Sequence, residues 1–203
     1  MVEVWLWSQK QDIGPLPRGY HAMSYDSHKQ KTLLFGGVSF NNEYLNDTWE
    51  WDGDIWTQVA DTGPPIRVFT SMTFDSQRNK TILFGGRDST SDLRDTWEWD
   101  SSIWTQVADI GPSSRHFHSM VFNSEKNKTI LFAGVDYNYQ NIFHDTWIWN
   151  GKFWTQRQDI GPQKALHSMA YDSDRNHVVL FGGANNIAAL SDTWELKVEI
   201  HPE

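Results

Sequence analysis

The stretch that decides the fold runs from Gly63 to Gln106 and has the sequence GPPIRVFTSMTFDSQRNKTILFGGRDSTSDLRDTWEWDSSIWTQ. The same order of features occurs four times along the 203 residues of the chain. Such self-similarity at a fixed period is the signature of a repeat architecture. The Gly-Pro pair that begins the stretch recurs at spacings of 49, 48 and 50 residues, at Gly14, Gly63, Gly111 and Gly161.

Each copy carries the same landmarks after its Gly-Pro pair. A basic residue comes first, then a methionine in an apolar run, a polar turn, and a second apolar run that ends in two small residues. The small pairs are Gly36-Gly37, Gly85-Gly86, Ala133-Gly134 and Gly182-Gly183. The tripeptide Asp-Thr-Trp then begins at Asp47, Asp95, Asp145 and Asp192. A final Trp-Thr-Gln begins at Trp56, Trp104 and Trp154, and Trp7-Ser8-Gln9 is its counterpart near the N-terminus.

The landmarks predict four strands in each unit. In the second copy these strands are residues 68–74, 81–84, 96–99 and 103–107, which are rich in β-branched and aromatic residues. Asp52-Gly53 and Asn150-Gly151 are strong hairpin signals between the third and fourth strands. Between the first two strands, Asp75 can close a turn and Asn79 can adopt the left-handed conformation. No window has helical periodicity, so the fold class is all-β.

Four-stranded units with this period, a glycine pair after the second strand and tryptophans in the last two strands resemble kelch repeats. The resemblance covers roughly residues 5–196, and Ala133 departs from it by replacing the first glycine of its pair. It implies a β-propeller in which each unit is one blade around a central channel. We therefore expect a single propeller domain over residues 1–203. Its blades are expected at about 14–62, 63–110, 111–160 and 161–200, the last completed by residues 1–10.

The two ends of the chain complement each other. Thr193 to Leu196 is a third strand with no Trp-Thr-Gln after it, and Trp5 to Gln9 is a fourth strand with no unit before it. We expect the N-terminal strand to close the last blade, which would remove an exposed sheet edge. A closed four-bladed monomer is the favoured reading. Because kelch propellers usually have six or seven blades, two alternatives stay open: a larger ring shared by two chains, and a piece of a longer propeller.

Composition limits the choice of partners and compartment. The net charge is −9, which disfavours nucleic acid as a partner. The chain has no cysteine, which excludes disulfides and thiolate metal sites. It starts without the basic and apolar regions of a signal peptide, and no stretch approaches the ~20 apolar residues of a membrane span. We expect no membrane contact and favour a cytoplasmic location.

Features that occur in every copy are expected to serve the scaffold. The Asp of Asp-Thr-Trp is interpreted as an acceptor for nearby turn amides, and the tryptophans as packing between blades. One repeat position holds His21, Thr70, His118 and His167. Buried, hydrogen-bonded histidines are favoured there over metal ligands, because Thr70 breaks the set. His116 and His118 are the best local candidates for an acid–base or metal pair.

Two groups of residues are candidates for ligand binding. The first is the set of cations that precede the innermost strands, where the resemblance places one mouth of the channel: Arg18, Arg67, Arg115 and Lys164. A ring of cations there could hold a carboxylate, and the alternative is that each forms a salt bridge with an Asp of a neighbouring blade. The second group lies in the stretches that differ between copies, residues 38–44, 87–93, 135–143 and 184–190. From these stretches we select Arg87, Tyr44, Tyr137, Tyr139, Asn138 and Asn185.

These residues favour a non-catalytic scaffold that binds a protein or peptide through the loops at one mouth. Tyr and Asn combine rigid apolar area with adaptable hydrogen bonding. The resemblance supports the class, because kelch-like folds mostly serve as binding modules. A glycan-binding module is the alternative, and a small-molecule or metal-dependent enzyme is a third possibility. No paired carboxylates, His-x-x-x-His or phosphate loop specify catalysis, so we expect no catalytic residues, cofactor or metal.

Overall fold

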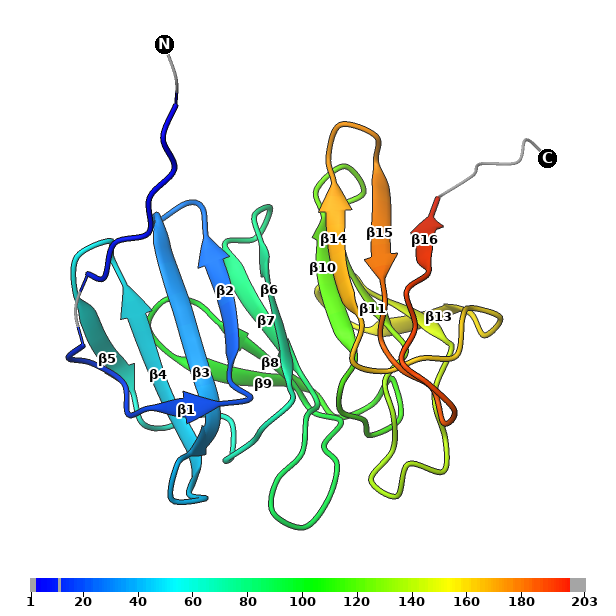
Figure 1. Cartoon of the computed structure of the whole chain (residues 1–203), viewed down its shortest axis with the longest axis horizontal. Helices are drawn as coiled ribbons and strands as arrows, with labels where there is room; N and C mark the ends of the chain where they lie inside the picture. Colours follow the sequence, from blue (N-terminus) through cyan, green and yellow to red (C-terminus); the bar gives the residue numbers. More distant parts are fainter. Residues whose placement is uncertain (1–2, 11, 198–203) are drawn as a thin grey trace.

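The computed structural model describes residues 3–10 and 12–197, which form four antiparallel sheets and no helix. The sheets are the blades of a four-bladed β-propeller (Figure 1). Blade 1 contains β1 (Arg18–Gly19), β2 (Ala22–Asp26), β3 (Lys31–Ser39), β4 (Tyr44–Trp51) and β5 (Trp56–Ala60). Blade 2 contains β6 (Ser71–Asp75), β7 (Lys80–Phe84), β8 (Thr96–Trp99) and β9 (Trp104–Ala108). Blade 3 contains β10 (Ser119–Asn123), β11 (Lys128–Phe132), β12 (Thr146–Trp149) and β13 (Trp154–Gln158), and blade 4 contains β14 (Ser168–Asp172), β15 (His177–Phe181) and β16 (Thr193–Leu196).

The predicted turns form for the predicted reasons. In blade 2 the carboxylate of Asp75 accepts hydrogen bonds from the backbone N–H groups of Gln77 and Arg78, each at 3.0 Å, and so closes the turn between β6 and β7. Asn79 ends this turn with a φ of 54°, the left-handed conformation that Asn tolerates well. The β6–β7 register therefore pairs Asp75 with Lys80 and aligns the two strands without a bulge.

Blades pack through the repeated tryptophans. Between blades 1 and 2, Trp99 and Trp104 lie against Phe35, and the ring centroids of Phe35 and Trp104 are 5.4 Å apart. The indole nitrogen of Trp104 donates to the hydroxyl of Thr48 in blade 1 at 2.8 Å. Trp104 therefore ties blade 2 to blade 1 by both apolar contact and a directed hydrogen bond.

The small pair after each second strand is required by close backbone approach. Gly85 has a φ of 59°, and a Cβ on it would lie 2.9 Å from the carbonyl oxygen of Arg115 in the next blade. Ala133 replaces glycine at this position in blade 3 and keeps the same conformation, with a φ of 55°, while fully buried. A methyl group is therefore accommodated there at the cost of a strained backbone.

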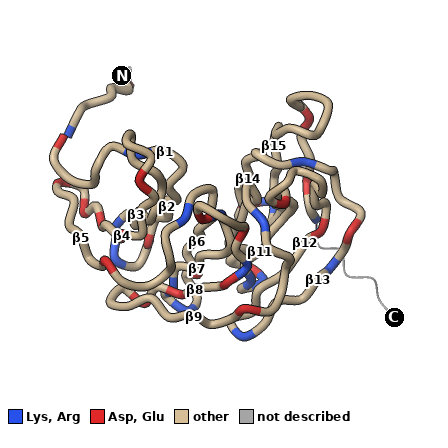
Figure 2. The backbone as a smooth tube through the Cα atoms, turned by 90° about the horizontal axis from the view of Figure 1, so that it is seen from below, with Lys and Arg blue, Asp and Glu red and all other residues tan. Residues whose placement is uncertain are grey.

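The blades follow one another around an arc rather than a closed ring. The strands β2, β6, β10 and β14 lie side by side in that order. Backbone hydrogen bonds join each blade to the next near the channel, from Phe69 to Tyr20, from Phe117 to Phe69 and from Leu166 to Phe117. Among the described residues no such bond joins blade 4 back to blade 1. Figure 2 shows the sheets running from β1–β5 at one end of the arc to β14–β15 at the other.

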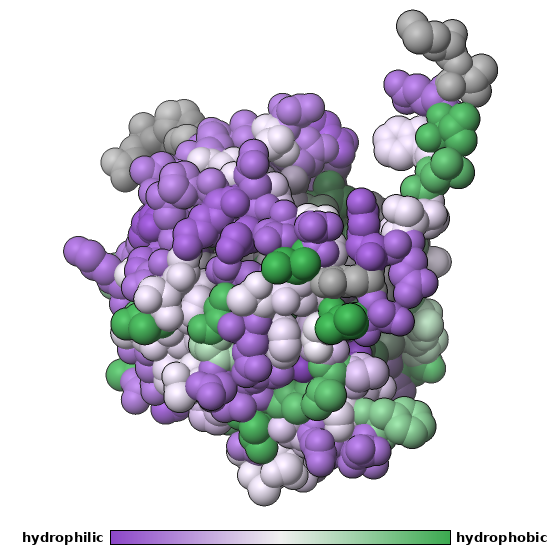
Figure 3. All heavy atoms as spheres, turned by 90° about the vertical axis from the view of Figure 1, so that its left-hand side faces the viewer, coloured by the Kyte–Doolittle hydropathy of each residue, from purple (hydrophilic) through white to green (hydrophobic). Residues whose placement is uncertain are grey.

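The expectation that the N-terminal strand closes the last blade is wrong in this structure. Residues 3–10 form no strand, Trp7 is fully exposed, and the sheet of blade 4 ends at β16. Figure 3 shows this N-terminal segment projecting away from the body of the protein. The reason is geometric: the segment is attached to blade 1, and blades 1 and 4 lie at opposite ends of the open arc (Figure 1).

Candidate functional site

One end of the blades carries all the long connections. The tight turns between first and second strands lie at the opposite end, so the loops that differ between copies gather around a single mouth of the channel (Figure 1). We call this end the loop mouth and define it by residues 36–44, 85–94, 133–144 and 182–191 together with the segments that lead into β2, β6, β10 and β14.

The four cations expected at this mouth are buried. The side chains of Arg67, Arg115 and Lys164 are 0% exposed, and Arg18 is 3% exposed. Each cation forms an ion pair with the Asp of its own blade's Asp-Thr-Trp motif: Arg18 with Asp47, Arg67 with Asp95, Arg115 with Asp145 and Lys164 with Asp192. The ion-pair alternative thus describes these residues, with the difference that the partner belongs to the same blade and not to a neighbour.

Blade 2 shows the geometry of these pairs. Both terminal nitrogens of Arg67 donate to Asp95 at 2.8 Å, and Arg67 also donates to the carbonyl oxygens of Gly85 at 2.9 Å and Pro65 at 3.1 Å. Burial alone raises the pKa of Asp95, but the hydrogen bonds and charge of Arg67 and the indole N–H of Trp97 hold it below its ordinary value. In blades 1 to 3 the arginine thus ties the first residue of the small pair to the Asp of the Asp-Thr-Trp motif, and we do not propose these pairs as ligand contacts.

The histidines of the repeat position lie between blades. His118 and His167 are buried, whereas His21 is half-buried. Burial lowers the pKa of His118 well below 6.5 and that of His167 to about 4, so both rings are uncharged at neutral pH. Across residues 3–10 and 12–197, no three His, Asp or Glu side chains cluster closely enough to hold a metal ion.

An aromatic and cationic patch covers the boundary between blades 2 and 3. The guanidinium of Arg87 lies 4.0 Å above the ring centre of Tyr137, close enough for a cation–π contact. Tyr139 packs edge-on against the ring of His116, with centroids 5.4 Å apart, and about half of its surface stays exposed. Tyr139 has a φ of 56° at the tip of the blade 3 loop. A tyrosine in this sparsely populated conformation is a position where backbone strain often accompanies function.

Beneath this patch lies a buried acid–imidazole pair. The Nδ1 atom of His116 and a carboxylate oxygen of Asp92 are 2.9 Å apart, and the two side chains are 0% and 2% exposed. Burial, with the charges of Asp136 and Asp88 in support, raises the pKa of Asp92 to about 6 against the opposing charge of Arg87. Burial and the charge of Arg87 lower the pKa of His116 to about 4. The blade 2 loop and blade 3 therefore meet at two buried groups whose charged forms are both disfavoured.

His116 and Asp92 belong to one blade boundary only. The positions equivalent to His116 hold Gly19, Val68 and Ala165, and those equivalent to Asp92 hold Tyr44, Ile142 and Ala189. Comparing repeat positions column by column would have identified Asp92, which the sequence reasoning missed. His116 does not act together with His118: His116 contacts Tyr139 and Phe117 at the mouth, whereas His118 packs edge-on against Phe84.

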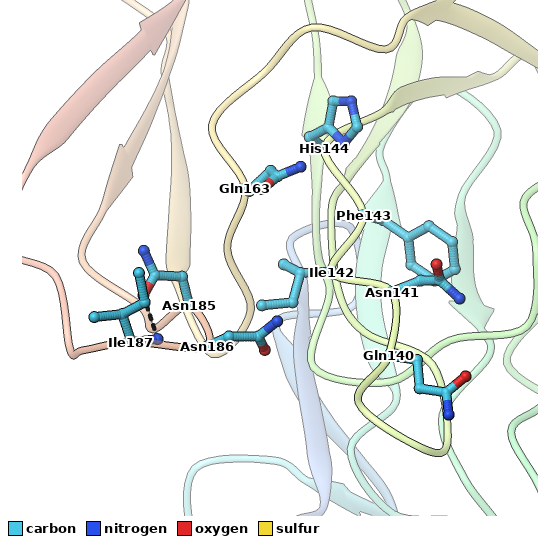
Figure 4. Close-up of a pocket in the computed structure, with 9 residues that line it drawn as sticks. All are labelled: Gln140, Asn141, Ile142, Phe143, His144, Gln163, Asn185, Asn186 and Ile187. Carbon is cyan, nitrogen blue, oxygen red and sulfur yellow. Dashed lines mark hydrogen bonds between the residues drawn. The ribbon is translucent and has the colours of Figure 1, made fainter.

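A pocket of about 450 Å³ lies on the other side of the blade 3 loop, between it and the blade 4 loop. Its lining is rich in amides and combines them with apolar side chains: Gln140, Asn141, Gln163, Asn185, Asn186, Ile142, Phe143, Ile187 and His144. Figure 4 shows Ile142 and Asn186 pointing toward each other from the two loops. Asn185 uses its side-chain oxygen to accept the backbone N–H groups of Ile187 and Ala188 at 2.9 and 3.0 Å, which shapes the blade 4 loop.

Three of these amides are available to a ligand. In the part of the chain that the structure describes, the side chains of Gln140, Gln163 and Asn186 make no hydrogen bond, and all three residues are exposed. A primary amide offers two donors and one acceptor oxygen. A backbone peptide group presents one of each, so amides can pair with it in both directions. The pocket can therefore hold a polar chain whose donors and acceptors alternate.

The structure brings together only part of the predicted set. Arg87, Tyr137 and Tyr139 lie together on one side of the blade 3 loop, and Asn185 lines the pocket on the other side. Asn138 is exposed at the tip of the same loop, whereas Tyr44 is half-buried in β4 of blade 1. Gln163 and His144 were missed, because they lie outside the stretches that differ in length between copies. The blade 3 loop, residues 135–143, is the centre of the candidate site.

The repeated blades and their in-blade ion pairs define a class of protein, the kelch-type propeller scaffold. The chain belongs to the kelch-repeat family: the family model described as the KLHDC2/KLHL20/DRC7 Kelch-repeats domain matches residues 3–162. No curated protein matches the chain. Kelch propellers are generally non-enzymatic, and the fold is consistent with a protein-binding scaffold. Among the described residues, no helix is long and apolar enough to cross a membrane.

Proposed function

We propose that this protein is a non-catalytic scaffold that binds an extended peptide segment of a partner protein at the loop mouth. The bound segment lies in the amide-lined pocket between the loops of blades 3 and 4. The observation that carries the proposal is the set of three exposed amides without internal partners, Gln140, Gln163 and Asn186, around one pocket. A peptide backbone needs donors and acceptors in alternation, which these side chains supply.

The chemistry of the rest of the pocket supports a peptide. Ile142 and Ile187 offer apolar surface beside the amides, which suits the side chains of an extended segment. The loops that carry these residues are positioned by rigid blades, as binding loops on repeat scaffolds are. The arginines of the Arg–Asp pairs stabilise the blades and do not contact the peptide, because they are buried and their charge is neutralised by the paired Asp.

A glycan ligand is less well supported by the same patch. Sugar rings stack on open aromatic faces, but one face of Tyr137 is covered by the guanidinium of Arg87 at 4.0 Å. Tyr139 contacts His116 edge-on and stays half exposed, so it provides a single aromatic surface. A peptide uses the amides of the pocket without requiring a stack.

The test is selection of peptides from a displayed random library on the purified chain, followed by calorimetric affinities of the enriched sequences. The double variant Q163A/N186A is expected to weaken binding at least tenfold, because it removes amides that pair with the peptide backbone. Q77A is the matched control, since Gln77 lies in the β6–β7 turn at the opposite end of the blades. Unchanged affinity in Q163A/N186A, or enrichment on a glycan array that Q163A/N186A abolishes, contradicts the proposal.

A further inference from the structure

Among residues 3–10 and 12–197, the sheet of blade 4 has three strands, one fewer than the sheets of blades 2 and 3. In blades 1 to 3 a fourth strand pairs with the third: β5 with β4, β9 with β8 and β13 with β12. In the described part of the chain, nothing pairs with the outer edge of β16. An unpaired strand edge is a template for pairing with another chain.

The fourth strand of each complete blade inserts a tryptophan into a defined site. In blade 3, Trp154 donates from its indole nitrogen to Thr96 of blade 2 at 2.8 Å and packs edge-on against Phe84 at 5.3 Å. It also fills the space above Gly111, where a Cβ would lie 2.5 Å from the indole. Trp104 makes the same three contacts in blade 2, with Thr48, Phe35 and Gly63.

The equivalent site on blade 4 is an open apolar pocket. Thr146, Phe132 and Gly161 occupy the three equivalent positions, and they line a pocket of about 180 Å³ with mainly apolar walls. Met169, Leu180 and Trp194 also line the pocket, and we call these six residues the fourth-strand site. The hydroxyl of Thr146, which would accept an indole N–H, accepts the side-chain amide of Gln158 at 3.2 Å in its place.

The N-terminal segment has the sequence that fits this site. Trp7-Ser8-Gln9 matches the Trp-Thr-Gln of the other fourth strands, and Trp7 precedes Gly14 by seven residues, just as Trp154 precedes Gly161. Trp5 and Trp7 are 89% and 105% exposed, so both indole rings are unprotected from water in this structure. Burying one large aromatic side chain contributes about 2 to 3 kcal/mol, so the exposed segment has a strong drive to pair.

The end faces of the arc are complementary as well. On blade 4, Phe181 is 56% exposed, whereas its equivalent Phe84 is fully buried against blade 3. On blade 1, Met23 is 47% exposed, whereas its equivalent Met72 is buried against blade 1. In the interior of the arc, faces of these two types pack on each other. A blade 1 face is therefore the natural partner of a blade 4 face.

We propose that two copies of this chain associate head to tail, each inserting its N-terminal segment, residues 5–9, into the fourth-strand site of the other. The blade 1 face that follows the segment then packs on blade 4 of the partner copy. Two four-bladed arcs joined in this way make a ring of eight blades, within the usual range of four to eight. Because the exchange is reciprocal, a two-fold axis relates the two contacts, so the assembly closes and the outer edge of β16 is paired in both copies. Exchange between copies lets each N-terminal segment reach a β16 strand, although within one chain the segment and β16 lie at opposite ends of the arc (Figure 1).

The test uses the absence of cysteine in the chain. In blade 3, Thr155 pairs with Ile148, so the same register places Ser8 opposite Glu195 of the partner copy. Two single-cysteine chains, S8C and E195C, are mixed under a mild oxidant, with one chain carrying a tag that changes its mass. The expected product is a disulfide-linked heterodimer of S8C and E195C. S8C mixed with Q77C is the matched control and is expected to give none.

Two further measurements make the outcome decisive. Light scattering is expected to give the mass of a dimer for the wild-type chain and of a monomer for W7A, which removes an exposed side chain and leaves the blades intact. W7A/S8C is expected to lose at least tenfold in cross-linking yield. A monomeric mass for the wild-type chain without cross-linking overturns the proposal. A double-cysteine S8C/E195C chain that cross-links only within itself also overturns it, because the segment then closes its own ring.

Discussion

The ion pair between Arg67 and Asp95 makes a sharp prediction about stability. Replacing Arg67 with Met keeps apolar volume in the site but removes two hydrogen bonds to Asp95 and one each to the carbonyl oxygens of Gly85 and Pro65. The carboxylate of Asp95 is then left largely buried, with only 16% exposure. The folded blade must carry this charge without its partner.

Breaking a buried pair costs about 3 to 5 kcal/mol, because the remaining charge is uncompensated. Asp95 keeps the indole N–H of Trp97 at 2.6 Å, so the expected loss for R67M is at the lower end, about 3 kcal/mol. The loss is expected to shrink at acid pH. Without Arg67, burial raises the pKa of Asp95 against the indole N–H of Trp97, so in R67M the carboxyl takes up a proton as pH falls toward 4 and the unpaired charge is removed.

The assay is urea unfolding at 25 °C, followed by circular dichroism and tryptophan fluorescence at pH 7 and pH 4. K126M is the control, because Lys126 pairs with Glu125 on the surface, where both side chains are over one-third exposed. Such a surface pair contributes about 0 to 1 kcal/mol. The reasoning is refuted if R67M costs no more than K126M at pH 7, or if the loss grows on acidification.

Two other predictions concern the mouth and the blade boundaries. Relative to wild type, D92N is expected to gain unfolding free energy as pH rises from 4 to 7, since it removes a carboxyl whose raised pKa of about 6 makes folding less favourable once ionised. H116Q is expected to show the opposite slope: the pKa of His116 is lowered to about 4, so the imidazole of the wild-type chain opposes folding at acid pH and ceases to do so as pH rises past its unfolded pKa. Each effect is up to about 3 kcal/mol. Parallel slopes for the two variants in a pH series of urea titrations would contradict this prediction. G63A is expected to lose about 1 to 3 kcal/mol, since its Cβ would meet Trp104 at 2.7 Å at a φ of +132°, whereas G19A, with open space around its Cβ, stays within about 0.5 kcal/mol in the same titration.

Much of the scaffold could be predicted from the sequence because the repeat fixes it locally. Turn residues such as Asp75 and Asn79 act on their own neighbours, and strand periodicity sets which side chains face the next blade. The expected strands therefore agree with the observed ones to within three residues in blade 2. Ala133 also keeps the conformation expected of the glycine that it replaces.

Two features could not be predicted from the sequence: that the arc of blades stays open, and that the four cations of the repeat are buried. Whether the end blades meet depends on the small rotation between successive blades, which accumulates around the arc and leaves no local signal. Arg67 was expected to face either a ligand or a neighbouring blade. Its true partner, Asp95, lies 28 residues away in the same blade, and only the packing of the Gly-Gly turn brings the two together. Gln163 reaches the pocket from the segment between β13 and β14, outside the stretches selected from the sequence.

The central claim is that the repeated residues hold the scaffold while the blade 3 and blade 4 loops bind a partner. Hydrogen–deuterium exchange of the chain with and without a library-selected peptide tests it most directly. The account predicts slower exchange in residues 135–143 and 184–190 on binding, with no change in the β6–β7 turn. Protection confined to the turns at the opposite end, or to the outer face of blade 1, would contradict it.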